Sequence, residues 1–320
     1  VDIRIPQSLM NRSEVTSIEK DALEYIESLN VSTIVINMLP GRVGHSIRKP
    51  LVRGGHQIVD LAFTEENPQT LDALAIEHKA TMIWDIGIAP GLSNMLLAQA
   101  QRELGHLDEV NIHVGGNPTQ PDDEWSYMAP FSPRDVIAEY TRPARVVRKG
   151  VIVTLPALTE RHSIEVEGRG TMEAFLTDGL RSVMTSIPAE EMSEYTIRWP
   201  GHIERFVRER ESNSLDLERL IGEWRFDSDA PEFTWMEVST IDNLGNSMNW
   251  IVNDSGGEDG SSMARTTGLV TLGCIRAWIE DPAMLEPGIH APESLPRNVV
   301  NSIIEMMREN GVEIIGPIVN

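Results

Sequence analysis

Two observations predict an α/β fold for this chain of 320 residues. In the first third, short apolar runs alternate with helical patterns, which is typical of a parallel sheet with helices on both faces. From about residue 107, apolar runs come in pairs separated by turn residues, which indicates a largely antiparallel sheet. We expect a parallel-sheet domain over residues 1–106, an α+β domain over 107–258, and C-terminal helices over 259–320 that pack back on the first domain.

Three apolar runs are the expected strands of the parallel sheet. Thr33–Met38 (TIVINM) is rich in β-branched residues, as buried parallel strands are. Gln57–Phe63 (QIVDLAF) and Thr81–Ile86 (TMIWDI) come next, and Pro68–Lys79 between them has apolar residues at helical spacing. Val1–Ile5 (VDIRI) also has a strand pattern, but no Gly-x-Gly-x-x-Gly turn opens the chain. We infer an N-terminally truncated Rossmann-type domain that lacks its first one or two βα units.

The pattern changes in the second domain. A strand over Glu109–Val114 is expected to end at the glycine pair 115–116. Arg145–Leu155 has Lys149-Gly150 at its centre, which predicts a hairpin. The other expected elements are a hairpin of Phe233–Val238 with Ser247–Val252, and helices over Ser262–Glu280 and Arg297–Asn310.

Composition excludes several classes of protein. The net charge of −22 disfavours binding to nucleic acid or to anionic membranes. No apolar run reaches the roughly 18 residues of a membrane helix, and the N-terminus lacks the pattern of a signal peptide. Cys274 is the one cysteine and cannot form an internal disulfide, so we expect a cytoplasmic protein. No histidine pair has the spacing of a zinc motif, so no metal site is predicted.

The first candidate site is Asn37-Met38-Leu39-Pro40-Gly41, at the carboxyl end of an expected strand. Ligands of open α/β sheets bind beyond the carboxyl ends of the strands. An asparagine there can bind a ribose hydroxyl, and Pro-Gly lets the backbone approach a ligand closely. The alternative interpretation is a simple strand-to-helix turn.

The second candidate site is the segment 85–94 (DIGIAPGLSN), at the end of the expected strand Thr81–Ile86. A helix that starts near Gly91 offers free N–H groups to a carboxamide or an anion. Asp85 stands where strand gives way to loop, a position suited to a proton acceptor. Its alternative role is turn or capping chemistry.

The third candidate site lies in the second domain. Arg198 is able to clamp a substrate carboxylate with two parallel N–H bonds, and His202 to shuttle a proton. The alternatives are a surface ion pair for Arg198 and a structural histidine at a helix start for His202. Ser132-Pro133 by itself predicts only a helix start.

Eight segments together resemble the saccharopine reductase-like family, most closely its lysine 6-dehydrogenase branch. They occur in family order and span most of the chain. They are INMLPGRVGHS (36–46), IVDLAF (58–63), DIGIAPGLSN (85–94), VGGNP (114–118), FSPRDVIAEY (131–140), MEAFLTDGL (172–180), IRWPGH (197–202) and SSMARTTG (261–268).

The resemblance implies NAD or NADP as cofactor, an amino-acid substrate and a homodimer or higher homo-oligomer. It implies hydride transfer from a carbon that bears an amine, giving an imine that water opens. The residues implied beside the nicotinamide ribose are Asn37, Leu39, Pro40 and Gly41. Those implied near the nicotinamide ring are Asp85, Gly87, Ala89, Pro90 and Gly91, with Asp85 as the catalytic proton acceptor. Those implied to bind the substrate are Tyr127, Ser132, Thr177, Arg198 and His202.

Two positions depart from the saccharopine reductase pattern. Ala89 stands where those enzymes tend to have an acid, and Val114 where they tend to have a cysteine. Both differences favour a lysine 6-dehydrogenase-like activity. The alternatives are a saccharopine or carboxynorspermidine reductase of the same family, and a non-catalytic paralogue that binds a metabolite.

Overall fold

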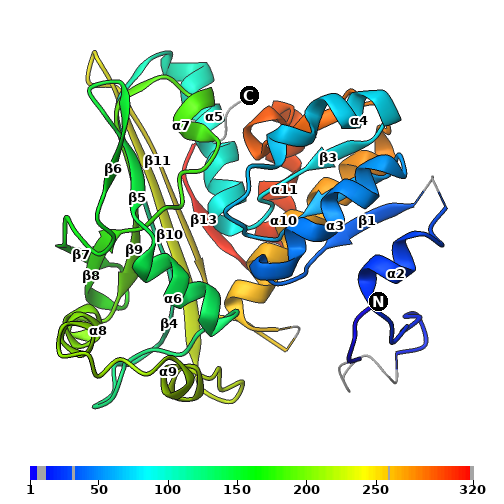
Figure 1. Ribbon diagram of the computed structural model, residues 1–320. Helices are drawn as coiled ribbons and strands as arrows, with labels where there is room; N and C mark the ends of the chain where they lie inside the picture. The colour runs from blue at the N-terminus through cyan, green and yellow to red at the C-terminus, as the bar shows by residue number, and fades with distance from the viewer. Residues whose placement is uncertain (6–11, 31–32, 259, 318–320) are drawn as a thin grey trace. The chain divides into compact units, whose positions relative to one another are not determined.

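The computed structural model describes residues 1–5, 12–30, 33–258 and 260–317 (Figure 1). The chain forms two compact units. The smaller unit consists of Val1–Asp85 and Trp278–Ala291, and the larger of Ile86–Ala277 and Pro292–Asn320. Residues 86–106, which we expected in the first domain, belong to the larger unit.

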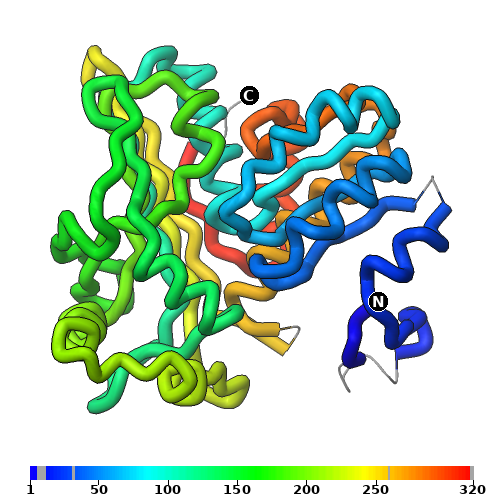
Figure 2. Tube along the Cα trace, viewed as in Figure 1, coloured from blue at the N-terminus to red at the C-terminus, as the bar shows by residue number. Residues whose placement is uncertain are grey.

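The smaller unit contains the predicted parallel sheet. Its strand order is β1-β2-β3-β12, and every neighbouring pair is parallel. The trace in Figure 2 leads from each of the first two strands into a helix and on to the next strand. Leu51, Ile58 and Met82 pack together in its core. The elements are α2 (Ala22–Ile26), β1 (Ile34–Asn37), α3 (Gly41–Arg53), β2 (Gln57–Asp60), η1 (Pro68–Leu71), α4 (Asp72–His78), β3 (Thr81–Ile83) and β12 (Gly288–His290).

The strand predicted over Val1–Ile5 is wrong. Only Asp2 forms a bridge, with Glu19. Val1 and Ile3 are 48% and 73% exposed, so the apolar side of this pattern has no sheet or helix to pack against. An alternating pattern stabilises a strand only where one of its faces is buried.

The larger unit contains a nine-stranded sheet within the described residues. Seven strands follow the order β13-β11-β10-β4-β9-β5-β6, and β8 joins β7 to β9 (Figure 1). The pair β4–β9 is parallel and the other pairs are antiparallel, which confirms the largely antiparallel sheet. The strands are β4 (Leu107–Pro118), β5 (Ala144–Arg148), β6 (Val151–Leu155), β7 (His162–Val166), β8 (Gly170–Leu176), β9 (Ala189–Arg198), β10 (Glu232–Asp242), β11 (Ser247–Asp254) and β13 (Glu313–Ile315).

Two turn predictions in this sheet had opposite outcomes. Lys149 and Gly150 both have positive φ, 52° and 71°, as the predicted two-residue hairpin turn requires. The glycine pair 115–116, in contrast, does not end its strand, because β4 continues to Pro118. A Cβ on Gly115 would lie 2.5 Å from the carbonyl oxygen of Ile197, so this glycine permits the close approach of β9.

Helices α6, α8 and α9 bury one face of this sheet. Tyr140, Phe206 and Leu220 from these helices form one apolar cluster with Phe175 of β8. Phe175 pairs with Thr196 of β9, and side chains on a strand alternate between faces. Glu194, Thr196 and Arg198 therefore project toward this helical layer. The helices and turns of the unit are η2 (Ile88–Leu92), α5 (Ser93–Leu104), α6 (Pro133–Thr141), α7 (Val183–Ser186), α8 (His202–Glu211), α9 (Leu217–Glu223), α10 (Ser262–Glu280), whose end lies in the smaller unit, η3 (Pro292–Ser294) and α11 (Arg297–Glu309).

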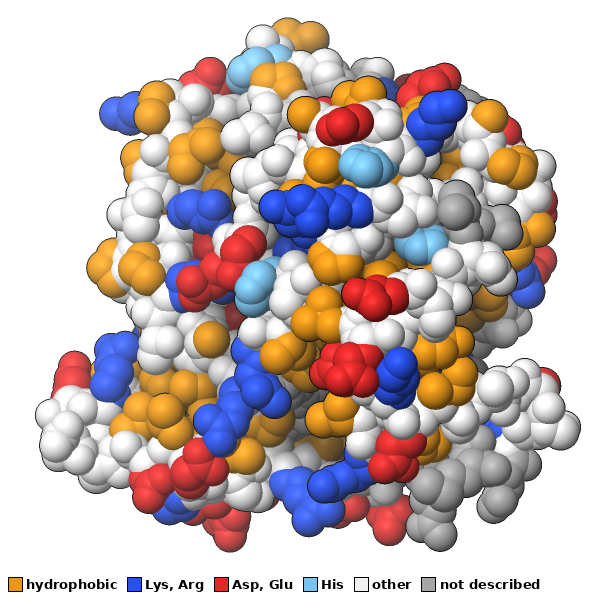
Figure 3. Space-filling view, turned by 45° about the vertical axis from the view of Figure 1, so that its right-hand side comes forward, with side chains coloured by type: hydrophobic (Ala, Val, Ile, Leu, Met, Phe, Trp, Pro, Cys, Tyr) orange, Lys and Arg blue, Asp and Glu red, His pale blue; other side chains and the backbone are white. Residues whose placement is uncertain are grey.

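Charged side chains of both signs are scattered over the face drawn in Figure 3, among polar and apolar areas. None of the helices within the described ranges is both long and apolar enough to cross a bilayer.

Candidate functional site

The carboxyl edge of the parallel sheet brings three polar residues to the ends of neighbouring strands. Asn37 ends β1, Asp60 ends β2, and Asp85 follows β3. All three are buried, and Asp85 has a left-handed φ of 54°. The carboxylate of Asp85 is near enough to Asp60 to raise its pKa. This edge is where ligands of open α/β sheets bind.

Asn37 uses its side chain to fix the turn that follows β1. Its amide nitrogen donates to the carbonyl oxygen of Gly44 at 3.1 Å and to Oδ1 of Asp60 at 2.9 Å. Its Oδ1 accepts from the backbone N–H of Leu39 at 3.2 Å. Both N–H bonds of the amide are thus taken within the protein, and the Oδ1 atom alone keeps a lone pair for a further donor.

The ion pair of Arg48 with Asp60 was not predicted from the sequence. Nε of Arg48 donates to Oδ2 of Asp60 at 2.5 Å, and its other nitrogens donate to Thr64 Oγ1 and the Ala62 carbonyl. Burial raises the pKa of Asp60 to about 6, although the guanidinium acts in the opposite direction. An aspartate inside the apolar run IVDLAF was the available signal, because a carboxylate buried there requires a partner.

In the larger unit, the predicted residues Gly87, Ala89, Pro90 and Gly91 lie in the turn before α5. Gly91 has φ 133° and ψ −95°, a conformation that only glycine adopts readily. Its N–H donates to Oδ1 of Asn94 at 3.2 Å, and the N–H of Leu92 donates to the Gly87 carbonyl at 2.9 Å. The turn is therefore closed by its own hydrogen bonds.

Arg198 is the centre of a second buried polar cluster. It ends β9 and is 3% exposed. Its Nε donates to the hydroxyl of Tyr140 at 2.8 Å, Nη2 donates to the hydroxyl of Tyr127 at 3.3 Å, and Nη1 donates to the Ile197 carbonyl. The guanidinium carbon also lies 4.3 Å from the centre of the Tyr127 ring. Within the described residues, no carboxylate forms an ion pair with Arg198.

His202 completes this cluster as a neutral side chain. One ring nitrogen bonds the Tyr140 hydroxyl at 3.1 Å and the other the Trp125 carbonyl at 2.9 Å. Burial and the nearby guanidinium of Arg198 lower the pKa of His202 to about 3. Burial raises the pKa of Tyr127 to about 12, so both phenol and imidazole are uncharged at neutral pH.

Thr177 and Ser132 have different surroundings. Thr177 Oγ1 donates to Oε2 of Glu194 at 3.0 Å and lies 2.8 Å from Thr196 Oγ1. Thr177, which follows β8, thus contacts the row of β9 side chains that includes Arg198. Ser132 precedes Pro133 at the start of α6, as predicted, and no hydrogen bond connects its side chain to Arg198.

Two carboxyl groups near Arg198 were also missed. Burial is the main cause that raises the pKa of Glu139 to about 8 and that of Glu194 to about 7. Glu194 raises the pKa of Glu139 further, while Arg198 and Arg142 lower it, and Arg142 also lowers the pKa of Glu194. The motif segment that ends at Tyr140 contains Glu139, but only the fold brings it to β9.

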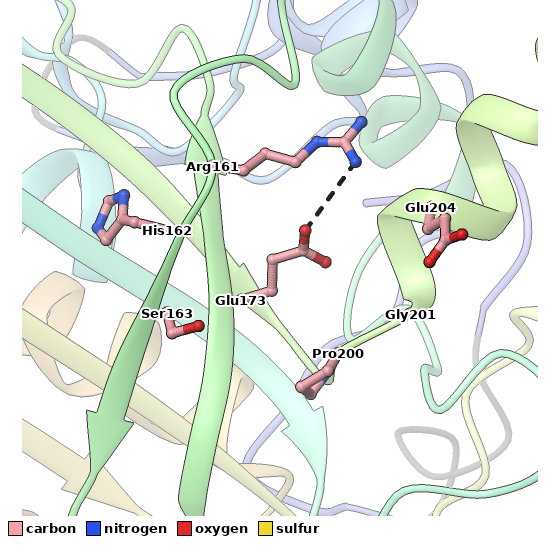
Figure 4. A pocket seen from close by; sticks show the side chains of 7 residues that line it. All are labelled: Arg161, His162, Ser163, Glu173, Pro200, Gly201 and Glu204. Carbon is pink, nitrogen blue, oxygen red and sulfur yellow. Dashed lines mark ion pairs between the residues drawn. The ribbon is translucent and has the colours of Figure 1, made fainter.

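A surface hollow of about 370 Å³ lies in the larger unit (Figure 4). Nη1 of Arg161 is 4.0 Å from Oε1 of Glu173, and Glu204 of α8 faces the same space. Burial raises the pKa of Glu173. None of the predicted site residues lines it; the lining residues are Arg161, His162, Ser163, Glu173, Pro200, Gly201 and Glu204. Elsewhere too, the described residues include no group of three or more His, Cys, Asp or Glu side chains placed to hold a metal ion.

The fold is of the Rossmann type followed by a large mixed sheet, and it is shared with solved enzymes. Apo saccharopine dehydrogenase (L-Glu forming) from Saccharomyces cerevisiae has a TM-score of 0.70 and 14% identity over 91% of this chain and 86% of that chain. Homospermidine synthase from Legionella pneumophila, solved in complex with NAD, has a TM-score of 0.63 and 12% identity over 92% of this chain and 78% of that chain.

The sequence itself gives the family. Residues 87–312 match the family model of the saccharopine dehydrogenase C-terminal domain, which is more than half of the chain. The chain therefore belongs to the saccharopine dehydrogenase family, as the eight motifs indicated.

Proposed function

We propose that this protein is an NAD(P)-dependent oxidoreductase that acts on the CH–NH or CH–NH2 bond of an amino acid, with lysine 6-dehydrogenase-like chemistry. Family membership and the Rossmann-type fold support an oxidoreductase. The observation that carries the substrate class is Arg198, a buried guanidinium whose partners are hydroxyl and carbonyl oxygens.

An unpaired buried cation is costly to the fold, and a substrate carboxylate would offset that cost. A carboxylate accepts charge-assisted hydrogen bonds from a guanidinium, which are stronger than those accepted by a neutral hydroxyl. Tyr127 and Tyr140 would hold the guanidinium in place for this contact. Thr177 would support the row of β9 side chains that includes Arg198, and His202 would hold the Tyr140 hydroxyl.

The carboxyl edge of the parallel sheet fits the nicotinamide half of NAD(P). Pro40 provides no side-chain cap for α3, so the first N–H groups of that helix are left for a ligand. A Cβ on Gly44 would clash with Cβ of Ala62, so this glycine allows α3 to lie close to the segment that follows β2. Leu39, Pro40 and Gly41 would contact the cofactor through their backbone, while Asn37 fixes their turn.

Asp85 is the proton acceptor in this proposal. The substrate ammonium must lose a proton before its carbon can release a hydride, and a carboxylate buried at the sheet edge can take it, directly or through water. NAD(P), when bound, accepts the hydride. The resulting imine takes up water and separates into a carbonyl compound and ammonia.

The first experiment follows the absorbance of reduced nicotinamide on the full-length gene product with L-lysine and NAD, then NADP. Reduction with lysine is the expected result. A response to secondary amines such as saccharopine, with none to lysine, would move the assignment to the reductases of the family. Absence of cofactor binding in a titration with both nucleotides would contradict the proposal.

Asp85→Asn tests the proposed mechanism. General-base catalysis contributes about 10²–10⁴-fold, so we expect kcat to fall by that range and to lose its rise with pH. Asp229→Asn, an exposed aspartate, is the control. An unchanged kcat and pH profile in Asp85→Asn would exclude Asp85 as the base.

The proposal also includes a cytoplasmic homodimer or higher homo-oligomer. Light scattering on purified protein would measure the mass in solution, and a mass of one chain would contradict that part.

A further inference from the structure

Glu293 is a buried carboxylate that the proposed mechanism does not use. It lies in η3 and is 9% exposed. Its Oε2 accepts from Ser182 Oγ at 2.9 Å and from Asn94 Nδ2 at 3.5 Å, and its Oε1 accepts from Ser186 Oγ at 2.5 Å. No described Lys, Arg or His side chain forms an ion pair with it. A carboxylate held in this way by neutral donors from two distant segments calls for an explanation.

One arm of this network leads to the turn before α5. Asn94 is 1% exposed and uses Nδ2 on Glu293 and on Ser182 Oγ, at 3.5 and 3.2 Å. Its Oδ1 accepts from the N–H of Gly91, the residue in the glycine-specific conformation. Ser93 Oγ donates to the same Oδ1 at 3.1 Å. Glu293 and the Ser182 hydroxyl that it holds thus help to orient the Asn94 amide, which provides one of the hydrogen bonds of the turn 87–91.

The other arm leads to α7. Ser182 and Ser186, one helical turn apart, both donate to the carboxylate. Their segment follows Thr177, whose hydroxyl donates a hydrogen bond to Glu194 of β9. The backbone of η3 is fixed independently, because Arg102 Nη2 donates to the carbonyl oxygens of Glu293 and Leu295.

We infer that Glu293 is a positioning residue that holds the turn 87–91 and the segment 182–187 in one arrangement. This inference rests on the proposed function, in which the turn 87–91 contacts the nicotinamide and the segment 182–187 follows Thr177, a residue proposed to support the substrate site. The Glu293 carboxylate then couples the conformation of the turn 87–91 to that of the segment 182–187. Two serine hydroxyls and one amide occupy three of the roughly four lone pairs of this carboxylate, which therefore joins the two segments as a hydrogen-bond acceptor.

Hydrogen exchange of the protein without cofactor tests the positioning directly. Losing a hydrogen bond of about 1.4 kcal/mol speeds local opening about tenfold, so Glu293→Ala should accelerate exchange about tenfold in peptides covering both 87–94 and 182–187. Ser186→Ala should affect 182–187 alone. Glu293→Gln should stay near wild type, because each serine hydroxyl can turn and accept from the new amide. Glu305→Ala, an exposed glutamate on α11, is the matched control.

Acceleration in neither segment, or in only one, for Glu293→Ala would overturn the inference. If Glu293→Ala does not fold, hydrogen exchange of the same peptides in Ser186→Ala and in the double variant Asn94→Ala/Ser186→Ala tests the inference instead. The single variant should accelerate exchange in 182–187 alone, and the double variant in both segments. A second arm adds NAD or NADP: protection of 182–187 by the cofactor should appear in wild type and be lost in Glu293→Ala. A cofactor that fails to bind wild type would contradict the proposed function, while exchange without cofactor would still decide the role of Glu293.

Discussion

Two buried arginines, Arg48 in the smaller unit and Arg198 in the larger, have opposite electrostatic surroundings. Both are at most 3% exposed. Arg48 contacts the carboxylate of Asp60 at 2.5 Å, whereas Arg198 contacts two phenol hydroxyls and a carbonyl. Arg48 therefore forms an ion pair with a carboxylate of the chain, whereas Arg198 forms none within the described residues and has only the electrostatic influence of Glu139.

The state of Glu139 bears on this difference. Its pKa is raised to about 8, which favours the protonated, uncharged acid at neutral pH. A protonated Glu139 leaves the positive charge of Arg198 uncompensated. We propose that Arg48 stabilises the fold and that Arg198 binds an anionic ligand.

The largest effect is expected for Arg48→Met. Removal of one partner of a buried ion pair costs about 3–5 kcal/mol of the free energy of unfolding, because Asp60 is left buried without its cation. Denaturant unfolding would measure it, with the exposed neighbour in Lys49→Met as control.

The pH dependence of Arg48→Met provides an internal check. The pKa of Asp60 is already raised to about 6, and loss of the guanidinium raises it further. A carboxyl whose pKa is raised in the folded state stabilises it at low pH, and this stabilisation is lost as the pH rises through the folded pKa. The destabilisation should therefore be smaller at pH 5 than at pH 8. An equal loss at both pH values would mean that Asp60 does not carry the cost.

Arg198→Met should change the free energy of unfolding little and KM for the amino acid strongly. No carboxylate loses an ion-pair partner, so the free energy of unfolding should change by only about 1 kcal/mol. Loss of charge-assisted hydrogen bonds of about 1.5–3 kcal/mol should raise KM for the amino acid about 10–100-fold. Arg208→Met, on the exposed side of α8, is the control for both measurements. A large loss of stability with unchanged KM would make Arg198 a structural residue like Arg48.

The sequence predicted the elements around both arginines better than their contacts. The alternation of β1, α3, β2, α4 and β3 was clear because each element buries one face, and that requirement leaves a period in the sequence. The hairpin at Lys149-Gly150 was clear because few residues adopt its turn. Val1–Ile5 failed because its pattern had no partner to pack against.

Contacts between distant segments leave no local pattern. Arg48 and Asp60 are separated by 12 residues, Arg198 and Tyr140 by 58, and Ser182 and Glu293 by 111. The motif IRWPGH contains Arg198 and His202, and the family resemblance implied Tyr127, but the hydrogen bonds of Arg198 and His202 to the Tyr140 hydroxyl were not predicted. Glu139, Glu194 and Glu293 were missed because a glutamate in an acid-rich chain is usually exposed.

Glu194→Gln tests whether the acids near Arg198 are protonated. A folded pKa of about 7 against the ordinary 4.5 favours the protonated acid in the fold, so wild type should lose stability as the pH rises from about 5 to about 8. Glu194 should contribute about 3 kcal/mol to this loss, since each pKa unit corresponds to about 1.4 kcal/mol, and Glu139 should add to it. Glu194→Gln, scanned by thermal unfolding, should lose less over this range than wild type or the exposed-site variant Glu190→Gln. Equal slopes would show that Glu194 is already ionised at the low end of this pH range.

The smallest effects come from a matched pair of hydroxyl deletions, Tyr140→Phe beside Arg198 and Thr64→Val beside Arg48. Each removes one acceptor from a buried guanidinium, at 2.8 and 2.6 Å. A neutral hydrogen bond contributes about 0.5–1.5 kcal/mol, and Asp60 still compensates Arg48 after the threonine hydroxyl is gone. Tyr140 also bonds His202, so its deletion leaves two buried groups without a partner. Tyr140→Phe should therefore lower the free energy of unfolding more than Thr64→Val, and added substrate carboxylate should restore part of the difference only for Tyr140→Phe. Equal losses without such recovery would mean that the two arginines do not differ in their need for a ligand.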